Sequence, residues 1–308
     1  MYRRTTGSEL FFSVLDELAK VVTEYPDEHV FAKRLLGVFE QLLAERPASM
    51  ATINALRQIS VFFLEKGLSE LHDYISKLRA DYDDALWKSA EVASRRVESG
   101  EKILTNSNST AIRRLLKFLR DQDKNVEIYV VESRPGNEGL LVAEYAESLG
   151  FKVYLIVDSA MRFFARSIDK VFVGAEAIAA NGAVVAKVGT SLAALVAKES
   201  RKRFFVVAPS MKFSYETIYG ELLKIPEGGA ELIVDPEKDR VVPEGFTARV
   251  PLYDVTPADY IDAIATEYGL VAPQAVPLLL KLVYGSYPPS IIPVHDILVA
   301  LKKKLRGG

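Results

Sequence analysis

The hydrophobic pattern of the chain changes near residue 100, and this change limits the folds that it can adopt. Between Glu9 and Val97 the apolar residues recur every three or four positions, as in Leu10, Val14 and Leu18. This spacing is typical of amphipathic helices. Beyond it, helical stretches near 109–121, 137–149 and 159–167 alternate with β-rich runs, which read KILT, VEIYVV, KVYLIV, KVFVGA and RFFVVA. Strands separated by helices in this way predict a parallel sheet with helices on both faces.

We therefore predict an α/β protein with a helical N-terminal domain over residues 1–100 and a Rossmann-like parallel sheet domain over residues 101–308. A hydrophobic content of 49% with 26% charged residues excludes a disordered chain. The N-terminal MYRRTTGSEL has no apolar signal region, and no later apolar run approaches the roughly 18 residues of a membrane span. A cytoplasmic location and no membrane partner are expected.

Charge and cysteine content narrow the possible functions. The 39 basic and 41 acidic residues leave a net charge of -2, so no global positive field favours nucleic acid, and none is expected as a direct partner. With no cysteine, the chain has no disulfide, thiolate metal site or cysteine nucleophile. No His, Asp or Glu pair has metal-ligand spacing, and a serine triad at Ser107 would need the distant His295. We expect neither metal nor cofactor.

The loops after the predicted strands are the candidate site, because ligands of such sheets bind beyond the carboxyl ends of the strands. The loop at 132–139, which reads ESRPGNEG, is not a GxGxxG motif, so a dinucleotide site is not predicted. The loops read ILTNSNST (103–110), ESRPGNEG (132–139), VGAEAIAANGAVVAKVGT (173–190) and APSMKF (208–213).

Three cations and one acid stand out in these loops. Arg134 could bind a phosphate through two hydrogen bonds or could be a surface arginine paired with a neighbouring acid. Lys187 precedes a predicted helix start, where anions are stabilised, and Lys212 follows a strand. Together these cations predict an anion pocket, and the alternative is that all three point into water. Glu176 follows an apolar strand as either a solvated carboxylate or an acid in a cleft.

In this order and spacing, the loops resemble the family that contains the regulatory alpha, beta and delta subunits of translation initiation factor 2B. The same family includes ribose-1,5-bisphosphate isomerase and methylthioribose-1-phosphate isomerase. The resemblance runs from RPASMATINALR to DVTPADYIDAIATEYGLVAPQAV and is most specific at 174–190. It implies a helical domain followed by a Rossmann-like domain, through which members form dimers and larger assemblies.

The resemblance also implies what the first of these loops does. The isomerase members carry a catalytic cysteine at the position of Ser107 and a catalytic aspartate at that of Glu176, and Asn106 replaces a histidine. An unassisted serine hydroxyl is too weak an acid to replace a thiol. Ser107 and Glu176 are therefore predicted to be vestigial positions with no catalytic role.

The phosphate-contacting positions of the isomerases match residues that this chain keeps, which are Ser109, Thr110, Arg134, Lys187 and Lys212. The resemblance thus implies a pocket for a phosphorylated small molecule, such as a sugar phosphate or a nucleotide. Ala186 departs from the usual asparagine before the lysine. The GAE sequence without a cysteine is similar to alpha-type regulatory subunits, whereas KFSYETIYGELL is similar to the isomerase branch.

Two functions follow from these features. The first is a non-catalytic, archaeal-type regulatory subunit similar to translation initiation factor 2B alpha. It would form a homodimer or larger homo-oligomer and bind the alpha subunit of translation initiation factor 2. The alternative is a sugar-phosphate aldose-ketose isomerase similar to ribose-1,5-bisphosphate isomerase, in which Glu176 and a serine or water replace the missing thiol.

Overall fold

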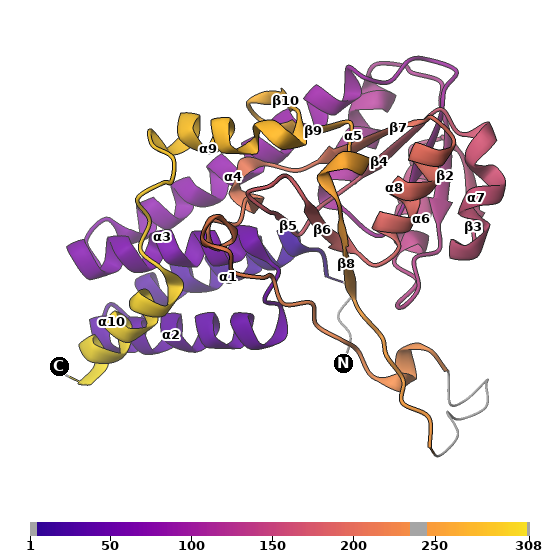
Figure 1. The fold of residues 1–308 in the computed structure, drawn as a ribbon. Coiled ribbons are helices and arrows are strands. Elements are labelled where there is room, and N and C mark those ends of the chain that lie inside the picture. The colour runs from indigo at the N-terminus through magenta and orange to yellow at the C-terminus, as the bar shows by residue number, and fades with distance from the viewer. Residues whose placement is uncertain (1–4, 235–244, 307–308) are drawn as a thin grey trace.

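The N-terminal part of the chain forms four long helices in this computed structural model, which describes residues 5–234 and 245–306 (Figure 1). They are α1 (Gly7–Glu24), α2 (Glu28–Glu45), α3 (Met50–Lys66) and α4 (Leu71–Ser94). Thr6 and Glu9 form a capping box at the start of α1, and Asp27 caps α2. The apolar stripes meet in a core around Phe11, Phe31 and Phe63. The C-terminal helix α10 (Val294–Arg306) packs against α2 and α3.

The second part of the chain forms a seven-stranded sheet with the strand order β10-β9-β7-β4-β1-β2-β3. All neighbours in this sheet pair in parallel except β9 and β10. From β1 the chain extends to β2 and β3 on one side and continues to β4, β7 and β9 on the other. The strands are β1 (Lys102–Thr105), β2 (Glu127–Val131), β3 (Lys152–Ile156), β4 (Lys170–Val173), β7 (Arg203–Val207), β9 (Ala263–Thr266) and β10 (Gly269–Val271).

Helices cover both faces of this sheet, so the predicted fold class is confirmed. Along β2 the side chains of Ile128 and Val130 join the core under α4, α5 and α6, whereas Tyr129 and Val131 join the core under α7 and α8. This alternation is the period of two that a strand requires. The covering helices are α5 (Thr110–Asp121), α6 (Gly139–Ser148), α7 (Met161–Phe164), α8 (Thr190–Glu199) and α9 (Val276–Tyr284).

A small antiparallel sheet beside the large one was not predicted. It consists of β5 (Ala177–Ile178), β6 (Val184–Lys187) and β8 (Tyr253–Thr256), in the order β5-β6-β8. A turn at residues 180–182 connects β5 to β6, with Gly182 at a φ of +82°. In the described part of the chain, no helix combines the length and the apolar character needed to cross a bilayer.

Gly139 at the start of α6 fixes how closely this helix approaches β2. A Cβ atom there would lie 1.8 Å from the carbonyl oxygen of Val131. We expect Gly139→Ala to lower the free energy of unfolding by about 3 kcal/mol or more, because the backbone must shift. Gly37, on the exposed side of α2, has no atom within 4 Å of its Cβ position. Gly37→Ala should instead stabilise the fold by about 0.5–1 kcal/mol. Equal effects of both changes in chemical denaturation would contradict this account.

Candidate functional site

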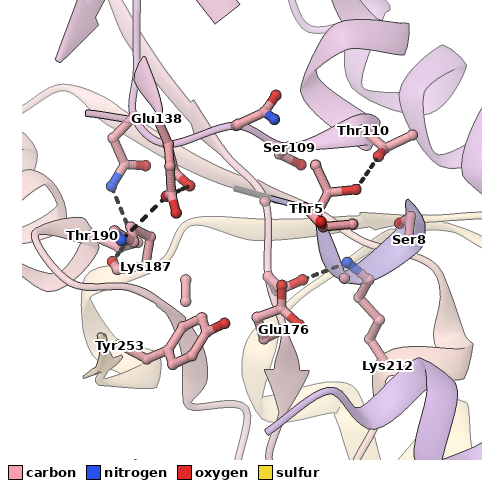
Figure 2. A pocket seen from close by; sticks show the side chains of 18 of the residues that line it. Thr5, Ser8, Ser109, Thr110, Glu138, Glu176, Lys187, Thr190, Lys212 and Tyr253 are labelled. Carbon is pink, nitrogen blue, oxygen red and sulfur yellow. Dashed lines mark hydrogen bonds and ion pairs between the residues drawn. The ribbon is translucent and has the colours of Figure 1, made fainter. Parts of the chain in front are cut away.

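A pocket opens beyond the carboxyl ends of β1 and β4, where the small sheet and the start of α1 also meet (Figure 2). It holds about 560 Å³ of empty space, including its open mouth. Both halves of the chain therefore contribute to it. Its lining is largely polar and includes Thr5, Thr6, Gly7, Ser8, Arg46, Asn106, Ser107, Asn108, Ser109, Thr110, Glu138, Glu176, Lys187, Thr190, Lys212 and Tyr253.

The loop after β1 is both the turn into α5 and one wall of this pocket. Ser109 caps α5 by accepting a hydrogen bond from the amide of Ile112. Asn106 donates to Thr190 Oγ1 at 2.9 Å, which ties the loop to the start of α8. Ser107 adopts a φ of +60°, a left-handed conformation that is uncommon outside glycine. Such a conformation persists only where the surroundings enforce it, and here they do so with two hydrogen bonds.

The two hydrogen bonds of Ser107 lead to the loop after β2. Its backbone amide donates to Ser133 Oγ at 2.6 Å, and its hydroxyl donates to Glu138 Oε2 at 3.1 Å. Ser133 in turn donates to the carbonyl of Val131 at the end of β2. The predicted loops ILTNSNST and ESRPGNEG are therefore held against each other by side chains rather than by a strand ladder.

Two lysines of the predicted anion pocket are buried in its wall. Lys187 Nζ lies 3.3 Å from Glu138 Oε2 and donates to the carbonyl of Pro135 at 2.8 Å. Lys212 Nζ donates to the carbonyl of Ala175 at 2.5 Å. Each lysine is only 5% exposed. Burial lowers the pKa of both lysines, and the charges of Glu138 and Glu176 oppose this shift for Lys187 and Lys212 respectively.

Glu176 follows β4 and lies in the cleft rather than in open solvent. Its carboxylate accepts a hydrogen bond from Ser49 at 3.2 Å and lies 3.8 Å from the guanidinium of Arg46. It also lies against the start of α1, since a Cβ atom at Gly7 would be 2.4 Å from Glu176 Oε2. The positive end of a helix dipole favours a carboxylate at this place. Of the two interpretations left open by the sequence, the structure shows the acid in a cleft.

The structure does not bring all of the predicted ligand residues together. Ser109 and Thr110 line the pocket, and the Thr110 hydroxyl lies 2.9 Å from that of Thr6. Arg134 lies outside it, because its exposed guanidinium donates to the carbonyls of Leu232 and Ile233. Direct phosphate contact by Arg134 stays a prediction.

Several lining residues were not assigned a role from the sequence. Arg46 donates to the carbonyl of Thr5 and to the hydroxyl of Tyr253, and so connects three distant segments. Burial raises the pKa of Tyr253 to about 12. Arg46 and Glu138 both lie in sequence motifs that resemble the family, RPASM and ESRPGNEG, and this was the only signal available. Among the described residues, no cluster of three or more His, Asp or Glu side chains could hold a metal ion.

Comparison with known proteins identifies relatives over most of the chain. Residues 6–273 match the initiation factor 2 subunit family (IF-2B). Ribose 1,5-bisphosphate isomerase of Methanocaldococcus jannaschii is 36% identical over 87% of this chain and 88% of that protein. A putative translation initiation factor eIF-2B subunit 2-like protein of Pyrococcus abyssi is 29% identical, over 87% of this chain and 88% of that protein.

Solved structures share the fold. The translation initiation factor eIF-2B of Pyrococcus horikoshii OT3 superposes with a TM-score of 0.77 at 25% identity, covering 88% of this chain and 93% of that one. The tetrameric eIF2B-beta2-delta2 complex of Chaetomium thermophilum contains a chain with a TM-score of 0.63 at 17% identity, covering 88% of this chain and 87% of that one. The second likeness shows the fold alone.

Proposed function

Because the chain belongs to the initiation factor 2 subunit family, we propose that it is a sugar-phosphate isomerase that interconverts an aldose phosphate and a ketose phosphate. Ribose 1,5-bisphosphate is the substrate proposed first, since five relatives that carry the name of its isomerase are 31–36% identical to this chain. Each of these matches covers more than four fifths of this chain.

The relatives correct the function predicted first from the sequence. The putative initiation factor subunits share only 28–29% identity with this chain, less than the five isomerases. The prediction of a non-catalytic regulatory subunit is therefore wrong, and its isomerase alternative is the better supported. Binding of initiation factor 2 belonged to the first prediction and is not part of this proposal.

The observation that carries the proposal is the burial of Lys187 and Lys212 in one pocket with the carboxylate of Glu176. An aldose-ketose isomerisation moves a proton between adjacent carbons and passes through an enediol that develops negative charge. Fixed cations in a partly desolvated site stabilise such charge, and a carboxyl group can exchange protons with the reacting oxygens. The same cations suit the phosphate groups of the substrate.

The proposal is tested by incubating the purified protein with ribose 1,5-bisphosphate and following ribulose 1,5-bisphosphate by phosphorus NMR. Ribose 5-phosphate is the control that lacks the phosphate on C1, and adenosine monophosphate is the control that carries a base there instead. We expect ketose to form from the bisphosphate alone. Saturable binding without any ketose would reject an isomerase and leave a ligand-binding protein.

We also propose that the chain self-associates, as the tetrameric complex of one structural relative suggests. We place a homodimer contact on the sheet half because of an exposed apolar surface there. On α9 the side chains of Leu278 and Leu282, one helical turn apart, are each 70% exposed. Apolar groups exposed in this way favour a protein interface. Light scattering at micromolar concentration should give twice the mass of one chain. The double variant Leu278→Glu with Leu282→Glu should give the mass of a single chain. A wild-type monomer would contradict the proposal.

A further inference from the structure

The proposed reaction needs a base, and no group of the loop after β1, where the resemblance places the catalytic cysteine of related enzymes, can act as one. A serine hydroxyl has a far higher pKa than a thiol, and no histidine lines the pocket in the described part of the chain. The nearest acidic group to Ser107 comes from another loop. It is Glu138, whose Oε2 accepts a hydrogen bond from the Ser107 hydroxyl at 3.1 Å.

The position of Glu138 is not explained by a role in its own helix. It precedes α6 as the N-cap residue, yet its side chain makes no capping hydrogen bond. The side chain turns into the pocket instead (Figure 2). The residue is 8% exposed there. Burying a carboxylate is costly unless charge and hydrogen bonds compensate it, and Lys187 and Ser107 provide both.

The backbone around Glu138 is fixed at the same time. Gly139 lies so close to the Val131 carbonyl that only glycine fits there. Its amide also donates to the carbonyl of Glu132 at 3.2 Å, which closes the loop on itself. A side chain fixed in this way, with its carboxylate directed at the catalytic position of related enzymes, has the preorganisation that proton transfer requires.

We propose that Glu138 is the proton-transferring base of this pocket and takes the place of the absent thiol, an inference that rests on the proposed isomerase function. The Glu138 carboxylate removes the proton from C2 of ribose 1,5-bisphosphate, and the electron pair of that bond forms the C1–C2 double bond. The bond between C1 and the ring oxygen breaks as this oxygen takes a proton from Glu176, which enters the step as the protonated carboxylic acid.

The resulting enediol carries a hydroxyl on C2 and the phosphate on C1. Its C2 hydroxyl returns a proton to Glu176 while C1 takes the proton held by Glu138. A carbonyl remains at C2, both carboxyl groups regain their starting states, and no oxidant or second substrate is needed. Ser107 acts as a positioning residue that directs Glu138 through its hydroxyl.

The test compares the kcat of Glu138→Gln with that of the wild-type protein. The amide keeps the size of the side chain and its hydrogen bond to Ser107 but cannot accept the C2 proton. We expect kcat to fall by about 10²- to 10⁴-fold, whereas the dissociation constant of ribulose 1,5-bisphosphate, measured by calorimetry, changes by less than about threefold. The rate at which the C1 protons of ribulose 1,5-bisphosphate exchange with deuterium oxide should fall by the same factor as kcat.

Two further variants complete the design. Glu144→Gln removes an exposed carboxylate from α6, the helix that follows Glu138, and should leave kcat unchanged. Glu138→Asp keeps a proton acceptor, retracted by one methylene, and should retain more exchange than Glu138→Gln. Circular dichroism verifies that each variant is folded. If Glu138→Gln does not fold, a loss of exchange of tenfold or more in Glu138→Asp supports the inference, and a smaller loss overturns it.

Each remaining result decides between the proposals. An active wild type with a Glu138→Gln variant within threefold of its kcat would overturn the role of Glu138 and leave the isomerase function standing. A Glu138→Gln variant that loses ligand binding more than tenfold would also overturn it, because Glu138 would then serve to hold Lys187. A wild type that binds the bisphosphate without turning it over would overturn the isomerase function itself, and this inference with it.

Discussion

Lys187→Ala is expected to lower the free energy of unfolding by about 3–5 kcal/mol and to abolish measurable binding of ribulose 1,5-bisphosphate. Lys187 and Glu138 have side chains that are 5% and 10% exposed, so removing the lysine leaves a buried carboxylate without its cation. The same change removes a charge that would bind the phosphate groups of the proposed substrate. Chemical denaturation and calorimetry measure the two effects separately.

Lys198→Ala is the matched control, because Lys198 is exposed at the end of α8 and lies outside the pocket. Its loss should change the free energy of unfolding by less than about 0.5 kcal/mol and leave ligand binding unaltered. A Lys187→Ala protein with the stability and affinity of Lys198→Ala would show that the Lys187–Glu138 pair has no structural or binding role.

Glu176→Gln is expected to reduce kcat by about 10²-fold or more while the protein keeps its stability within about 1 kcal/mol. Glutamine can still accept the hydrogen bond from Ser49 and fills the same space beside Gly7, but it cannot supply a proton to the ring oxygen. Glu65→Gln, an exposed change on α3, is the control for loss of one negative charge. Full turnover by Glu176→Gln would remove Glu176 from the proposed chemistry.

The fold could be predicted because its determinants are local. The spacing of apolar residues identifies the helices of the first half, and the β-rich runs identify β1, β2, β3, β4 and β7 of the large sheet, but β9 and β10 were not predicted. In the structure, the period of two of a strand places Ile128 and Val130 on one face and Tyr129 and Val131 on the other. Once strands and helices alternate, a parallel sheet with its loops at one edge follows from the general rules of such folds.

The small sheet and part of the pocket could not be predicted because their contacts join distant segments. The strand β5 has only two residues, and β6 pairs with β8, which lies more than 60 positions further along the chain. Arg46 reaches Thr5 and Tyr253 from the end of α2. No periodicity in the sequence records such side-chain contacts, so neither Arg46 nor Tyr253 was assigned to the site.

The prediction of a non-catalytic protein was wrong because the sequence does not show which acid contacts Ser107. The lack of catalysis was inferred from the replacements at Ser107 and Glu176 and from the lack of a nearby histidine. The acids beside Arg134, Glu138 among them, were interpreted only as its surface partners. In the structure Arg134 turns away from the pocket, and Glu138 contacts Ser107 and Lys187 instead. The contact between Glu138 and Ser107 joins the loops after β1 and β2, so it can be recognised only in the three-dimensional structure.

The central claim, that this pocket isomerises a sugar phosphate without a thiol, is tested most directly by proton NMR in deuterium oxide. The protein is incubated with ribose 1,5-bisphosphate at a concentration that saturates binding, and the C1 protons of the product are followed. We predict ribulose 1,5-bisphosphate formed by the wild type, with deuterium at C1 in those molecules for which the proton on Glu138 exchanges with the solvent before it reaches C1. Both formation of the product and this exchange should be lost in parallel in Glu138→Gln and Glu176→Gln. Bound but unconverted ribose 1,5-bisphosphate, without exchange of its C2 proton, would contradict the claim.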